Sequence, residues 1–184
     1  MKKIQILFIL ALSLTLLFCK KEKDTTFLIN KERVGKLLRT SKATEIDSIF
    51  QGDSIVREET QIAIGSFPPR FNIYEKGGKH LLTLTPNKDS LATIGLVRVY
   101  DNRYLTEEGI GLLSTFSDIK KSYEIKKIVT SLNNVVIFIE NKDFYFTIDK
   151  EELPASLRYD TSLNIEAVQI PDVAKIKYLM VGWD

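Results

Sequence analysis

Few residues of this 184-residue chain have the type and spacing that catalysis or metal binding requires. His80 is the only histidine and Cys19 is the only cysteine, whereas a zinc site uses three or four nitrogen, sulfur or carboxylate ligands. A serine nucleophile would need a neighbouring histidine and a strained turn, and the chain has no Gly-x-Ser-x-Gly segment. We therefore predict no metal site, no catalytic residue and no cofactor, and expect His80 to lie on the surface of a hairpin.

Paired carboxylates are the remaining source of acid and base chemistry. They occur only as sequence neighbours, at Glu58-Glu59, Glu107-Glu108 and Glu151-Glu152. Neighbours do not face each other on a helix or a strand, so none of these pairs is arranged for general acid and base catalysis. Two acids distant in the sequence can still meet in a fold, as glycoside hydrolases require, and a carboxylate-dependent hydrolase stays open as a minor alternative.

Cys19 has the clearest chemical role in the chain. Lys2 and Lys3 precede an apolar run from Ile4 to Phe18, and charged residues follow Cys19 at once. This order is typical of a bacterial lipoprotein signal, in which the cysteine becomes acylated, although Phe18 is bulky where a small residue is usual. We predict a signal peptide at residues 1–18, lipid attachment at Cys19 and a solvated tether at residues 19–26. An ordinary cleaved signal peptide and an uncleaved anchor helix are the alternatives.

Charge excludes one class of partner. The chain has 26 basic and 24 acidic residues, and cleavage before Cys19 would remove Lys2 and Lys3 and leave 24 of each. A nucleic-acid-binding protein would need a basic face, so we predict no nucleic-acid partner. The partners that we expect are a membrane, through the lipid anchor, and a protein of the cell envelope.

An internal similarity in the sequence predicts the helices and strands that must position any site. Ile29 to Leu37 matches Leu105 to Leu113 at an offset of 76 residues, and a short amphipathic helix pattern follows each segment. Four strand patterns then follow each helix: Ser54 to Ala63, Phe71 to Glu75, Leu81 to Thr85 and Ile94 to Tyr100 in the first half, and Ile125 to Ser131, Val135 to Glu140, Phe144 to Asp149 and Ile176 to Trp183 in the second. We predict an α+β fold in tandem pseudo-repeat, with residues 27–104 and 105–184 each forming a short helix packed on about four antiparallel strands.

The two halves differ most in the connection from Lys150 to Lys175. Connections of this length are usually functional unless they have structure of their own. We therefore propose Arg158, Tyr159 and Asp160 as partner-binding residues, with the alternative that Ile165 to Ile170 forms an extra edge strand. Other residues of the types that dominate protein interfaces are Tyr100, Tyr104 and Trp183.

These motifs together resemble a known family. The Val34-Gly35-x-Leu37 segment, the Tyr74-Glu75-x-x-Gly78 hairpin, the Ile94 to Asp101 strand and Gly111-x-x-Ser114-x-Phe116-Ser117-Asp118 are similar to a family of Gram-negative lipoproteins of unknown function. Its members include the enterobacterial lipoprotein that the envelope-stress sigma factor (sigma-E) regulates. The resemblance implies a lipid-anchored protein of the cell envelope, at the outer membrane and facing the periplasm. The arrangement also resembles β-lactamase inhibitor proteins, at the level of fold alone.

The sequence thus favours a non-enzymatic protein-binding or scaffold module that contacts its partner through a sheet face or the long connection. A periplasmic carrier of a small apolar ligand or of a cell-wall fragment is the alternative.

Overall fold

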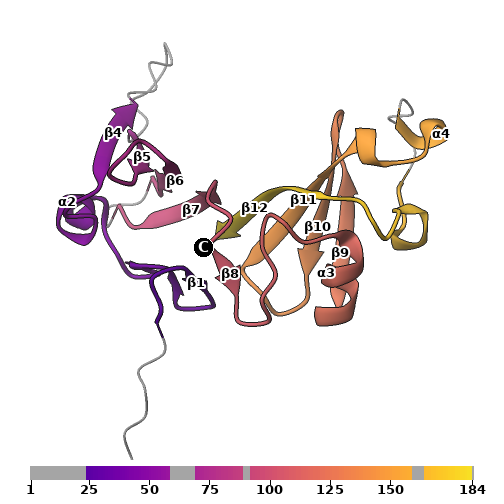
Figure 1. The fold of residues 1–184 in the computed structure, drawn as a ribbon, viewed down its shortest axis with the longest axis horizontal. Helices are drawn as coiled ribbons and strands as arrows, with labels where there is room; N and C mark the ends of the chain where they lie inside the picture. The colour runs from indigo at the N-terminus through magenta and orange to yellow at the C-terminus, as the bar shows by residue number, and fades with distance from the viewer. Residues whose placement is uncertain (1–23, 59–68, 89–91, 159–163, 184) are drawn as a thin grey trace, which may run out of the picture.

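The computed structural model describes residues 24–58, 69–88, 92–158 and 164–183. The strands among them form two sheets (Figure 1). The small sheet has the order β3-β2-β1-β8, formed by β1 (Leu28–Ile29), β2 (Arg33–Val34), β3 (Leu37–Leu38) and β8 (Leu105–Thr106). Its pairs are antiparallel except for β1 and β8, which run parallel.

The large sheet is antiparallel throughout and contains two runs of four consecutive strands. The first run is β4 (Ser54–Glu58), β5 (Arg70–Tyr74), β6 (His80–Pro86) and β7 (Ile94–Val99), and the second is β9 (Ile125–Thr130), β10 (Asn134–Ile139), β11 (Phe144–Asp149) and β12 (Ile176–Gly182). The sheet order is β4-β5-β6-β7-β12-β11-β10-β9, so the last strand of each run pairs with the other at the centre. The predicted α+β class and the order of strands within each half are confirmed.

Short helices precede each run and cover the core. The 3-10 turn η2 (Ala43–Glu45) and helix α2 (Ile46–Ile49) come before β4, and helix α3 (Phe116–Ser122) comes before β9. Thr115 caps α3: its hydroxyl accepts from the Asp118 backbone N–H, while the Asp118 carboxylate accepts from the Thr115 N–H. This reciprocal capping box satisfies two backbone donors that the first helical turn leaves free. Ile46 of α2 and Phe116 of α3 are fully buried.

The core lies on one face of the large sheet. Alternate residues of a strand point to opposite faces, and one register row of apolar residues crosses all eight strands on this face: Ile55, Ile73, Leu82, Val99, Leu179, Phe146, Ile137 and Ile128. Ile29 and Val34 of the small sheet belong to the same cluster of buried residues, so the small sheet and the helices cover this face. In Figure 1, β1 and β8 lie below β7 and β12.

The connection from β11 to β12 corrects one prediction. It contains the 3-10 turns η3 (Lys150–Glu152) and η4 (Ala167–Gln169) and the short helix α4 (Ala155–Arg158). The extra edge strand considered for Ile165 to Ile170 is therefore absent from this described segment, where the backbone closes the 3-10 turn η4 and forms no strand pairing with β9. The connection has its own local structure, and Ile165 and Ile170 anchor it in the core.

No helix among the residues that the structure describes combines the length and the apolar character needed to cross a membrane. The predicted signal peptide, Cys19 and most of the tether precede Asp24 and lie outside the described residues.

Candidate functional site

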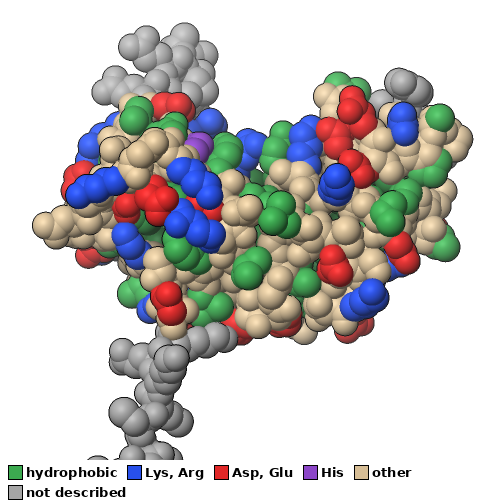
Figure 2. Space-filling view, viewed as in Figure 1, with side chains coloured by type: hydrophobic (Ala, Val, Ile, Leu, Met, Phe, Trp, Pro, Cys, Tyr) green, Lys and Arg blue, Asp and Glu red, His purple; other side chains and the backbone are tan. Residues whose placement is uncertain are grey.

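The face of the large sheet opposite to the core is lined by polar and aromatic side chains. The register row next to the apolar row also crosses all eight strands, and its residues point away from the core: Val56, Asn72, Thr83, Arg98, Met180, Tyr145, Phe138 and Lys127. We call this surface the open face. Figure 2 shows that the upper side of the molecule is hollowed between two lobes, with basic side chains along the hollow.

A stack of aromatic and cationic groups occupies the middle of the open face. The Tyr74 and His80 rings lie 4.5 Å apart between centroids, and the His80 and Tyr100 rings lie 3.8 Å apart, both nearly parallel. The Arg98 guanidinium then lies between two tyrosines, 4.7 Å from the Tyr100 ring centroid and 3.9 Å from that of Tyr178. Each contact between a guanidinium and a ring is attractive, and a flat cation held between two rings is preorganised for binding.

The position of His80 follows from the turn before it. Gly77 and Gly78 both have positive φ, at 107° and 88°, which allows the tight turn between β5 and β6. The register then shifts between Ile73 and Tyr74, which places His80 opposite Tyr74. His80 is half-buried between two rings, so the prediction of an ordinary hairpin surface residue needs correction.

The surroundings of His80 favour its neutral form. Burial lowers the pKa of the imidazole below its ordinary value, and the positive charge of Arg98 lowers it further, against the opposing effects of the Leu82 carbonyl and Glu58. Nε2 lies 3.2 Å from both the Leu82 carbonyl and the Thr83 hydroxyl. The histidine is thus held in place as a stacking group within the sheet.

Arg98 has an unusual combination of burial and missing partners. Its Nε is buried without a hydrogen-bond acceptor, and among the described residues its guanidinium forms no ion pair. A buried donor without an acceptor costs about 1 to 3 kcal/mol. A cation at the centre of an exposed sheet, held by rings and not by an acid, is suited to contact a group outside the chain.

A second aromatic pair extends the open face toward β9. Phe138 and Tyr145 stack with their ring centroids 5.1 Å apart, and the Lys127 ammonium lies 4.8 Å from the Phe138 centroid. Beside this pair is a pocket of about 460 Å³, lined in part by Leu96 and Gly182. Aromatic surface therefore continues from the first half of the sheet into the second.

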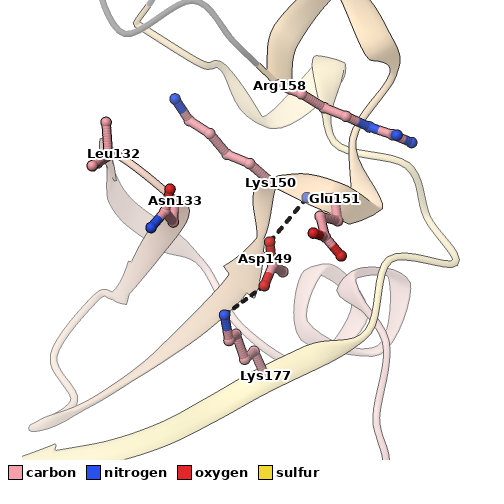
Figure 3. Close-up of a pocket in the computed structure, with 7 residues that line it drawn as sticks. All are labelled: Leu132, Asn133, Asp149, Lys150, Glu151, Arg158 and Lys177. Carbon is pink, nitrogen blue, oxygen red and sulfur yellow. Dashed lines mark hydrogen bonds and ion pairs between the residues drawn. The ribbon is translucent and has the colours of Figure 1, made fainter.

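The long connection contributes a pocket of about 680 Å³ (Figure 3). Asp149, the last residue of β11, accepts from the Glu151 backbone N–H and from the Lys177 ammonium, with N–O distances of 3.0 and 2.5 Å. Arg158 lines this pocket, but its Nε donates to the Leu153 carbonyl at 2.7 Å and Figure 3 shows its guanidinium directed away from Lys150. The other two predicted partner-binding residues, Tyr159 and Asp160, lie outside the described residues.

The other aromatic residues of the sequence prediction separate into two groups. Tyr104 and Trp183 are each only 2% exposed and belong to the core, whereas Tyr100 is exposed and joins the stack. Burial raises the pKa of the Tyr104 phenol far above its ordinary value, which keeps the residue neutral. Among these three aromatic candidates, all of which the structure describes, Tyr100 lies on the open face.

Sequence reasoning missed Arg98 and Tyr178. Arg98 and Tyr100 are two positions apart at the end of one strand, so period-two alternation already placed them on the same face. The pairing of β7 with β12, which brings Tyr178 to Arg98, has no local signal.

Both carboxylates of the second acidic pair have structural partners. Glu107 accepts from the Asn30 amide, and Glu108 accepts from the Tyr123 hydroxyl and from Lys142. Within the described ranges, no group of three histidine, cysteine or acidic side chains is arranged to hold a metal ion. Glu59 of the first acidic pair lies outside those ranges.

Comparison with known proteins identifies a related fold. No family model matches the chain, and no curated protein matches its sequence. The crystal structure of the uncharacterized protein YfeY from Escherichia coli is similar, with a TM-score of 0.59 and 13% identity over 84% of this chain and 98% of that chain. At this identity the similarity shows a common fold with a protein from a Gram-negative bacterium, and it assigns no activity.

Proposed function

We propose that this protein is a lipid-anchored lipoprotein of the Gram-negative cell envelope, and that it binds another protein through the open face of its large sheet without catalysing a reaction. The observation that carries the proposal is the stack formed by Tyr74, His80, Tyr100, Arg98 and Tyr178. Tyrosine and arginine dominate the energetics of protein interfaces, because they combine large apolar contact with hydrogen-bonding ends.

The geometry of the stack supports recognition of an acidic group on the partner. Arg98 presents a cation fixed by two rings, so little side-chain entropy remains to be lost on binding. A partner carboxylate would pair with this guanidinium, while apolar side chains of the partner would contact Tyr145 and Phe138. The open face thus combines a central charged contact with an aromatic surround.

Anchorage at the outer membrane is part of the same proposal. It rests on Cys19 and the apolar segment before it. We also propose that the two runs of four strands arose by duplication, because each follows a short helix and the runs meet through their last strands. An architecture like that of β-lactamase inhibitor proteins would follow from such a duplication.

A photocrosslinking experiment in cells tests the binding face. A photoreactive residue at Thr83, next to Arg98 on the open face, should give a discrete crosslinked product. The double substitution Arg98→Ala and Tyr178→Ala should reduce that product by about thirtyfold, the factor expected for loss of an interface hot spot. Arg57→Ala is the matched control, because the Arg57 guanidinium pairs with Asp47 at an exposed position. Equal crosslinking in both variants would remove the open face from the proposal.

A second candidate function rests on the pocket beside Phe138 and Tyr145. Its volume of about 460 Å³ falls within the usual size range of small-ligand sites. A carrier of an apolar ligand would retain that ligand through purification, and native mass spectrometry of the intact chain would detect the added mass.

A further inference from the structure

A third pocket, of about 450 Å³, lies at the turn between β10 and β11, and four of its eight lining residues are lysines. Asn141, with φ of 56°, forms this turn. The charged residues and the amide that line the pocket are Lys31, Lys126, Lys127, Lys142, Asn141 and Asp143. We call this site the lysine pocket. It is separate from the aromatic stack, which lies at β5, β6, β7 and β12.

Most of the positive charge in the lysine pocket is unpaired. Asp143 is the only acid in the lining, and it forms an ion pair with Arg39. Lys142 pairs with Glu108 at 3.0 Å. Among the described residues no acid pairs with Lys31, Lys126 or Lys127, although Lys127 lies over the Phe138 ring.

Because only Lys142 of the four lysines pairs with an acid in the described part of the chain, three unpaired ammonium groups remain around one cavity. Like charges gathered at one site repel each other, so such a cluster is stabilised by a bound anion. Ammonium groups bind phosphate as point charges and do not require the fixed geometry of a guanidinium fork. The lining therefore points to a phosphate-type oxyanion as the ligand.

The position of Lys31 indicates the source of that anion. Lys31 lies in the turn between β1 and β2, twelve residues after Cys19. Twelve residues span at most about 40 Å, so a lipid at Cys19 would keep the lysine pocket within reach of the bilayer surface. In Figure 1 the arrow of β10 ends at the lower edge of the sheet, the same edge below which β1 lies.

We propose that the lysine pocket binds the phosphate of an anionic phospholipid headgroup and thereby orients the domain on its membrane. This inference rests on the membrane anchorage of the proposed function, and it adds a ligand class and a site. The lysine pocket shares Lys127 and Phe138 with the end of the open face near β9. The stack is formed by residues on or next to other strands, so headgroup binding at the lysine pocket would leave the stack free for a partner.

Lysine footprinting on vesicles tests the inference with the full chain. The N-terminal apolar segment should hold the chain on vesicles of phosphatidylcholine alone and on vesicles that also contain phosphatidylglycerol. Acetylation of Lys31, Lys126 and Lys127, followed by mass spectrometry, should be about fivefold slower on the anionic vesicles, the factor that corresponds to the attraction of one lysine to an anionic surface. Lys76, exposed in the hairpin between β5 and β6, should react equally on both.

Matched variants and a free-phosphate arm complete the design. Substitutions K31Q, K126Q and K127Q together should abolish the preference for anionic vesicles in a competition between the two vesicle types, whereas K76Q, K121Q and K175Q, which remove equal charge at exposed positions, should preserve it. Equal acetylation of all lysines on both vesicle types would overturn the proposal. Full protection of Lys31, Lys126 and Lys127 from acetylation by glycerophosphate, in the absence of vesicles, would also overturn it. Failure of the chain to associate with either vesicle would count against the anchorage, and protection lost while association persists would count against the lysine pocket alone.

Discussion

Removal of the buried Asp101 carboxylate should be among the most destabilising single polar changes in this fold. Asp101 follows β7 and is fully buried. Its carboxylate accepts from the Arg103 guanidinium at 2.6 and 3.0 Å and pairs with Lys79 at 3.1 Å. Arg103 also donates to Glu75, so this network ties the turn between β5 and β6 to the chain that leads into β8.

The magnitude follows from the pKa of this carboxyl group. Burial alone would raise the pKa of Asp101, but hydrogen bonds from Arg103 and Lys79 outweigh burial and lower it from 3.8 to about 2. A difference of this size corresponds to about 2 to 3 kcal/mol at neutral pH. Because the folded-state pKa lies below the unfolded value, the stabilisation is present above about pH 4 and is lost as the pH falls toward 2.

We expect Asp101→Asn to lower the free energy of unfolding by about 2 to 3 kcal/mol at neutral pH, with the difference from the natural chain disappearing in acid. Urea titration followed by the fluorescence of Trp183, which is buried in the folded state, measures both effects. Asp47→Asn is the control, because that carboxylate also binds an arginine but is exposed, and it should cost less than about 1 kcal/mol. Equal losses in the two variants, or a loss for Asp101→Asn that does not change with pH, would refute the reasoning.

Three further predictions concern separate parts of the chain. The folded state lowers the pKa of His80, so protonation in acid favours the unfolded chain. The free energy of unfolding of the natural chain, relative to that of His80→Gln, should therefore fall as the pH drops below about 6.5. Urea titration of both chains across this pH range measures the difference, and parallel pH curves would contradict the prediction. Gly35→Ala should cost more than about 2 kcal/mol, because φ is 59° and a Cβ would lie 2.4 Å from the Thr26 carbonyl oxygen, whereas Gly77→Ala, which meets open space, should cost only about 1. Thermal unfolding of both variants separates the two costs, and similar shifts would exclude the steric argument. Cys19→Ser should prevent acylation, and a mass spectrum that still shows the mass of acyl chains would eliminate Cys19 as their attachment site.

Local signals in the sequence predicted most of the elements. Alternating apolar residues marked the strands, the segment from Tyr74 to Gly78 marked a hairpin, and an amphipathic pattern marked the short helix before each run of strands. These features depend on residues within a few positions of one another, so a pattern can reveal them.

The arrangement of the site depended on contacts that no local pattern encodes. The pairing of β7 with β12 joins the two runs of strands and brings Arg98 against Tyr178. The parallel pairing of β1 with β8 is equally distant in the sequence. The long connection was predicted to bind a partner because of its length, whereas the residues of the proposed binding site lie on or next to regular strands. Register between strands, and not composition, determined which aromatic residues faced outward.

The central claim is that the open face is the surface that binds a partner. The most direct measurement is photocrosslinking in intact cells from Thr83, on the open face, compared with crosslinking from Lys121, on the exposed side of α3. The account predicts a discrete product from Thr83 that is lost with Arg98→Ala and Tyr178→Ala, and no such product from Lys121. A product from Lys121 alone, or a Thr83 product that survives the double substitution, would contradict it.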